Sequence, residues 1–255
     1  MYTKLDSLVT SLAGVDLNPN YFVKCDLRTI RQNIVASLEK YSAVEHSYRF
    51  CLQEYSINPS SLKFALSHLS HQNIEAIARR SYLHPNGFVK IVLLESQLPF
   101  FRLRLHVWPS GQTNVIEEDA HNHGWDVFST VMAGRISIRN FNVVAGSTHN
   151  RFLLNSNLKD NRTYEFLNKG PCSLSESFTA TLNAGAYYQS PSHTIHRVHP
   201  EDNALAATLV LQGISHEQVS SVFIASGGQP RISQHPRALR CDELKAAVDR
   251  FLKSI

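Results

Sequence analysis

Hydrophobic and polar residues follow two different periods along this chain, and the period changes near residue 87. Before that point, apolar residues recur every three or four positions, as in the stretch 27–41, which begins behind Asp26 as the N-cap. The same spacing predicts further helices at about 43–54, 60–69 and 71–81. Each apolar stripe needs a partner surface, so we expect these helices to pack against the outside of the remaining structure without supplying functional side chains.

From residue 87 onward, short segments rich in β-branched and aromatic residues replace the helical period. Gly, Asn, Pro and Ser separate them. The predicted strands are FVKIVLLE, FRLRLHVW, WDVFSTVMAG, RISIRNFNV, RFLLN, RTYEFLN, SESFTATLN, AYYQS and ALAATLVLQ. Many closely spaced strands with no helix between them predict a mainly β fold, an antiparallel sandwich or barrel.

These patterns divide the 255 residues into three parts. Residues 1–82 form the helical segment, and residues 83–225 form the β-barrel. Residues 226–255 contain an irregular exposed connection, GGQPRISQHPR, and the C-terminal helix DELKAAVDRFLKSI. The length fits one large domain with appended helices.

Composition excludes several classes of protein. With 43% hydrophobic and 18% charged residues, the chain is neither disordered nor fibrous. The net charge of +4 is scattered along the chain with no basic arm, so we expect no nucleic-acid partner. No apolar run has the length of a signal peptide or a membrane span, which predicts a cytoplasmic protein without a membrane partner.

The positions of the histidines in the sequence are the strongest indication of a functional site. Two of the 13 histidines, His121 and His123, form an HxH pair. On a strand, residues two apart point to the same face, so this pair directs two imidazoles at one point. A second cluster, GAYYQSPSHTIHRVHP, contains His193, His196 and His199. Transition metals bind well to such imidazole groups.

Together, the two clusters resemble the paired motifs of the cupin superfamily. Gly134 follows His123 by eleven positions, as in the first cupin motif. Gly185, Pro191 and His196 follow the spacing of the second motif, six and then five residues apart. The resemblance covers about residues 87–225. It implies a double-stranded β-helix, which is a jelly-roll-like barrel, with a metal bound by His121, His123 and His196.

The acidic ligand of many cupins is missing, because its position in the first motif holds Val127. Asp126 is adjacent, but on a regular strand it faces the opposite side. The remaining three-histidine set resembles the thiol dioxygenase branch, and the order of elements resembles cysteine dioxygenase. This resemblance implies an Fe(II)-dependent dioxygenase that uses O2 on a small thiol-like or amino-acid-like substrate, with Ni, Cu or Zn as alternative metals.

The substrate residues depart from that branch. In the thiol dioxygenase pattern, an Arg pairs with the substrate carboxylate, and its nearest counterpart here is Lys90. A Tyr late in that pattern corresponds to a position near Gln212, and a Cys of the pattern corresponds to Val127. The polar candidates for orienting a substrate are Lys90, Gln212, Tyr187, Tyr188 and His193. The alternation in FRLRLHVW leaves open whether His106 lies inside the barrel or faces solvent, and His199 is expected not to be a ligand.

Two other functions stay open at this point. One is a cupin that binds a metal or a small molecule without turnover, as a sensor or accessory protein. The other is a metal-dependent isomerase or lyase. In each case the expected partner is a small molecule, and the oxygenase would also bind O2. The oligomeric state stays open, and a homodimer is one of the possible states.

Overall fold

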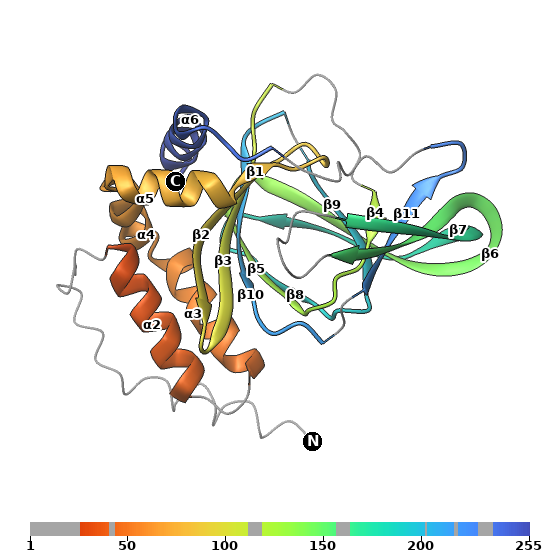
Figure 1. Cartoon of the computed structure of the whole chain (residues 1–255), viewed down its shortest axis with the longest axis horizontal. Coiled ribbons are helices and arrows are strands. Elements are labelled where there is room, and N and C mark those ends of the chain that lie inside the picture. Colours follow the sequence, from red (N-terminus) through yellow and green to blue (C-terminus); the bar gives the residue numbers. More distant parts are fainter. Residues whose placement is uncertain are drawn as a thin grey trace.

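The computed structural model describes residues 26–40, 44–111, 119–156, 164–201, 203–216, 219–228 and 237–255. Two antiparallel sheets form its centre, and helices cover one side (Figure 1). The helices are α2 (Leu27–Lys40), α3 (Val44–Ile57), α4 (Ser60–Ser67), α5 (His71–Arg80) and α6 (Cys241–Leu252). In the described part of the chain, no helix has the length and apolar character needed to cross a membrane.

The first sheet has six strands and the second has five, and every pairing is antiparallel. The six-stranded order is β1 (Tyr82–Leu83), β2 (Val89–Gln97), β3 (Phe100–Trp108), β10 (Ala206–Gln212), β5 (Val127–Ala133) and β8 (Tyr187–Ser190). The five-stranded order is β11 (Val219–Ala225), β4 (Ala120–His121), β9 (Ile195–Pro200), β6 (Arg135–Ser156) and β7 (Tyr164–Asn183). This mainly β architecture, with N-terminal helices and a C-terminal helix, is the predicted fold class.

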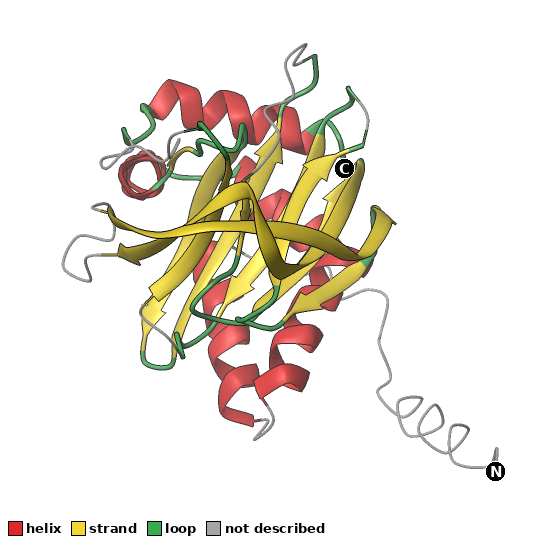
Figure 2. Cartoon of the chain, turned by 90° about the vertical axis from the view of Figure 1, so that its right-hand side faces the viewer, coloured by secondary structure: helices red, strands yellow, loops and turns green. Residues whose placement is uncertain are grey.

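Alternate side chains of the six-stranded sheet point to its two faces, and both faces are buried. Its outer face, with Leu103 and Leu105 of β3, packs against the helices in the largest apolar core, which includes Ile30 of α2 and Phe251 of α6. Its inner face contributes Trp108 to a second core shared with the five-stranded sheet. The helices thus lie against the outer face of the six-stranded sheet (Figure 2).

The predicted strands differ from the observed ones in the second sheet. RISIRNFNV and RFLLN form one strand, β6, and RTYEFLN and SESFTATLN form another, β7. Register shifts and the positive φ angles of Gly146 and Gly170 let both strands continue through the polar segments that suggested turns. Figure 1 shows this ribbon extending away from the helices. The short strands β1 and β4, together with β9 and β11, were absent from the prediction.

Some expectations concern residues outside the described ranges. They include the N-terminal sequence up to residue 25 and most of the connection at 227–237.

Candidate metal centre

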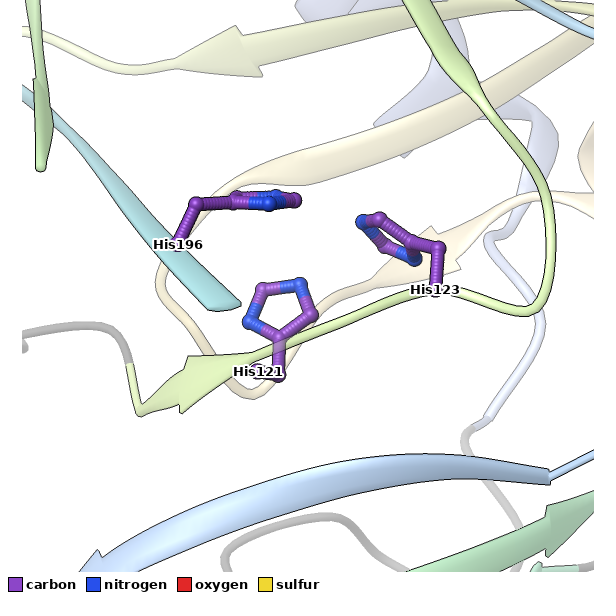
Figure 3. Close-up of side chains that lie close together, drawn as sticks. All are labelled: His121, His123 and His196. Atoms are coloured by element: carbon purple, nitrogen blue, oxygen red, sulfur yellow. The ribbon is translucent and has the colours of Figure 1, made fainter. Parts of the chain in front are cut away.

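Three histidine side chains lie close together (Figure 3). His121 ends β4 and lies directly opposite His196 of β9 in the pairing of these strands. His123 follows in the loop after β4. Their ligand nitrogens all lie within 4.8 Å of one another, and the ring centroids are 4.8, 5.0 and 5.1 Å apart. This arrangement can hold one metal ion.

Backbone carbonyl groups orient two of the rings. Nδ1 of His121 lies 2.9 Å from the carbonyl oxygen of Asp119, and Nδ1 of His196 lies 3.2 Å from that of Thr194. A carbonyl oxygen can only accept, so Nδ1 of each ring carries the proton. In the neutral ring, Nε2 then provides the lone pair for a metal, which is the usual arrangement of a metal-binding histidine.

The electrostatic surroundings keep two of the rings neutral. Burial lowers the pKa of His196 to about 3, and the neighbouring His121 adds to the effect. Burial also lowers the pKa of His123 well below its usual value, with further contributions from His121 and His196. A metal binds only the neutral imidazole. Both rings are therefore ready to bind a metal at neutral pH.

Asp126 has other partners. Its Oδ1 accepts a hydrogen bond of 2.8 Å from the backbone N–H of Ser192, and its Oδ2 lies 3.6 Å from Nε2 of His216. Within the described residues, the group that could hold a metal here consists of the three histidines alone. That Asp126 is not a ligand stays a prediction.

The predicted substrate residues are divided between two surfaces. Tyr188 packs beside Trp125 on the inner face, and the Lys90 Nζ donates a 2.9 Å hydrogen bond to the Tyr82 hydroxyl. The buried Gln212 accepts a hydrogen bond from Arg104 through its Oε1. Tyr187, in contrast, packs against the outer core, and His193 is exposed in the turn before β9. The roles of these side chains toward a substrate stay predictions.

Two side chains next to the histidines were missing from the predicted site. The Trp125 ring lies 4.7 Å from that of His123, centroid to centroid, and the Arg104 guanidinium carbon lies 5.2 Å from the Trp125 centroid. The alternation in FRLRLHVW places Arg104 and His106 on one face. Because both faces of this sheet are buried, the pattern could not indicate which one lies inside. His106 lies on the inner face beside Phe88.

Comparisons with known proteins gave matches only among solved structures: no family model matches the chain, and no curated protein does. Hydroquinone 1,2-dioxygenase from Sphingomonas sp. TTNP3, with 4-hydroxybenzoate bound, is 14% identical with a TM-score of 0.26, over 46% of this chain and 61% of that one. Oxalate oxidase in complex with glycolate is 14% identical with a TM-score of 0.32, over 53% and 55%.

Hydroxypropylphosphonic acid epoxidase from S. wedmorenis is 10% identical with a TM-score of 0.32, over 72% of this chain and 96% of that one. This chain thus spans less than two thirds of the dioxygenase and the oxidase. TM-scores below 0.5 do not establish a common fold. The function proposed next therefore depends on the geometry of the three histidines.

Proposed function

We propose that this protein is a cupin-type oxygenase that binds one Fe(II) ion through His121, His123 and His196 and oxidises a small molecule with O2. The supporting observation is the convergence of the three ring nitrogens within 4.8 Å. Fe(II) prefers six ligands, and three protein ligands on one side leave neighbouring positions for a substrate and for O2. The cupin resemblance of the two histidine motifs points to the same chemistry.

The donor set fits such an ion, because three neutral imidazoles suit Fe(II), Ni, Cu and Zn. Bound Fe(II) would supply the redox chemistry that O2 requires. The chain itself positions the rings: the carbonyl groups of Asp119 and Thr194 set the tautomers of His121 and His196. The backbone N–H of His123 donates a 3.2 Å hydrogen bond to the Ser192 carbonyl, which ties its loop to the turn before β9.

Charge favours an anionic substrate group at the metal. Three neutral ligands leave the 2+ charge of the ion uncompensated. The described strands contain only three acidic residues, Glu95, Glu165 and Glu176, and the nearby Asp126 is paired with His216. A thiolate or carboxylate of the substrate would therefore be attracted to the ion.

The same donor set favours one second candidate function. Three histidines with an open fourth position also form catalytic Zn sites. In that case the protein would be a metal-dependent isomerase or lyase, without a need for O2.

The test is metal analysis of protein purified without oxygen, followed by O2 consumption with small thiols, amino acids and organic acids. We expect about one Fe per chain and substrate-dependent O2 consumption. The His196→Ala variant should lose both, whereas His216→Ala, which removes an exposed histidine outside the cluster, should keep both. Stoichiometric Zn with no O2 consumption after Fe(II) loading would favour the second candidate, and protein that binds no metal would contradict both.

A further inference from the structure

Two of the three candidate metal ligands belong to strands, and the third does not. His121 ends β4 and lies opposite His196 of β9, so strand pairing fixes these two residues relative to each other. His123 lies in the loop 122–126, which joins β4 to β5 and contains no strand residue. Metal affinity depends on groups that hold each ligand in place. The contacts of this loop therefore decide whether His123 reaches the other two rings.

The Asp126 side chain joins this loop to the turn 191–194. Its Oδ1 accepts a 2.8 Å hydrogen bond from the backbone N–H of Ser192. In the opposite direction, the backbone N–H of His123 donates a 3.2 Å hydrogen bond to the Ser192 carbonyl. Both backbone polar groups of Ser192 are therefore bonded to the loop, and one of the two bonds is made by the Asp126 carboxylate.

The same turn leads into the strand that carries His196. It closes through a 2.9 Å hydrogen bond from the Thr194 N–H to the Pro191 carbonyl. The Thr194 carbonyl oxygen then lies 3.2 Å from Nδ1 of His196. A shift of this turn relative to the loop would change the distance between His123 and His196, and it would also turn the His196 ring. The turn is thus common to both histidine motifs.

Backbone pairing does not extend to this contact. The pairing of β5 with β8 ends where Val127 lies opposite Ser190. The next residue after Ser190 is Pro191, which has no N–H to donate to a neighbouring strand. One residue further, the Asp126 carboxylate accepts the hydrogen bond from Ser192. A hydrogen bond to a charged acceptor is stronger than one between neutral groups, so the Asp126 side chain can hold the turn where the strand pairing stops.

On the basis of the metal site proposed above, we infer that Asp126 is a positioning residue of this site. By holding the turn 191–194 to the loop 122–126, it fixes His123 relative to His196. The role needs an acceptor oxygen at Oδ1. It does not need the second partner of the carboxylate, His216, whose side chain is 60% exposed and whose Nε2 lies 3.6 Å from Oδ2. Exposed ion pairs of this kind contribute little to stability.

The test titrates metal-free protein with Co(II), whose visible spectrum depends on the number and arrangement of its ligands. Urea denaturation first shows that each variant is folded. We expect Asp126→Ala to bind Co(II) roughly 10- to 100-fold more weakly, the range for loss of a group that supports a ligand, with a changed spectrum. Asp126→Asn keeps the acceptor oxygen without the charge and should restore the wild-type affinity and spectrum. His216→Ala is the matched control and should leave both unchanged.

A second variant removes the donor of the hydrogen bond instead of its acceptor. Ser192 is the second residue of the turn, a position that accommodates proline. Ser192→Pro lacks the N–H that bonds to Asp126 but keeps the carbonyl that bonds to His123, so it should also weaken Co(II) binding. Ser192→Ala keeps the N–H and is its control. The double variant Asp126→Ala/Ser192→Pro should bind Co(II) no more weakly than the weaker single variant, because both changes remove the same contact.

The two levels of inference fail in different ways. If the wild type binds neither Fe(II) nor Co(II), the proposed oxygenase function is wrong, and the positioning role is wrong with it. If the wild type binds Co(II) and folded Asp126→Ala binds it with the same affinity and spectrum, the positioning role alone is wrong. A loss in Asp126→Asn as large as in Asp126→Ala would also contradict this role, because the carboxylate would then act through its charge or as a ligand. If Asp126→Ala does not fold, the comparison of Ser192→Pro with Ser192→Ala decides: equal Co(II) affinities would contradict the role.

Discussion

At the scale of single residues, hydrogen-bond partners separate the histidines of the site from the neighbouring carboxylate. Carbonyl groups hold His121 and His196 with Nδ1 protonated, whereas Asp126 is held by the Ser192 backbone and His216. A metal ligand needs its donor atom directed at the ion, and Asp126 uses both carboxylate oxygens elsewhere.

Replacing one histidine should therefore empty the site. We expect His196→Ala to lower metal affinity by more than the roughly 10- to 100-fold that follows from loss of a supporting hydrogen bond, because the variant lacks one of three ligands. Asp126→Asn should keep its metal. Metal content after dialysis, measured by mass spectrometry, checks both variants. An Asp126→Asn protein without metal would show that the carboxylate belongs to the ligand set.

At the scale of elements, the turn between β5 and β6 depends on Gly134. This residue has φ +70°, and a Cβ there would collide with the carbonyl oxygen of Leu205 and lie 2.9 Å from the Cα of Ala206. The turn joins the two sheets, since β5 belongs to the first and β6 to the second. Its close contact with the chain before β10 leaves no room for a side chain.

Gly134→Ala should consequently destabilise the protein by more than the roughly 1–3 kcal/mol typical of a strained backbone conformation. Gly185→Ala is the matched control: it has φ +90° but nothing within 4 Å of the added Cβ, so only the backbone cost applies. Urea denaturation of both variants measures the difference. Equal losses of stability in the two variants would mean that the chain at Leu205 can move away from the added Cβ without a loss of free energy of unfolding.

At the scale of the whole molecule, the helices and the six-stranded sheet share one core. Ile30, Leu52 and Ile77 from three helices pack with Leu103 and Leu105 of β3. Deletion of residues 1–80 would expose this apolar face, so we expect insoluble or aggregated protein. Light scattering and metal content of the truncated protein provide the measurement. A stable, metal-loaded barrel would show that the helices form a separable unit.

Acid should weaken the metal-free fold. Burial lowers the pKa of His84, His106, His123 and His196, so below about pH 6.5 the unfolded chain binds more protons than the folded one. The free energy of unfolding should fall as the pH decreases from about 7 to 4, by at most about 1.4 kcal/mol per histidine per pH unit. Urea denaturation across this range checks the slope, and His106→Leu should reduce it. Stability that increases on acidification would contradict this assignment.

Much of the candidate metal site could be predicted from local spacing. His121 and His123 are two residues apart, so their side chains point to the same side of any extended segment. The inner face of the six-stranded sheet could not be predicted in the same way. Lys90, Arg104 and Ser129 come from three strands whose order in the sheet is set by pairing between distant segments, and period-two alternation does not distinguish two buried faces.

The sequence by itself determined the helices between residues 27 and 80, the change to a strand period and the candidate metal ligands, because these depend on residue type and short-range geometry. Only the tertiary structure decided that Arg104 and His106 face inward, that the Trp125 ring lies near both Arg104 and His123, and that Tyr187 faces the helices. The packing of the helices on one face of the six-stranded sheet assigns that face to the outside, and the opposite face becomes the interior beside the three histidines.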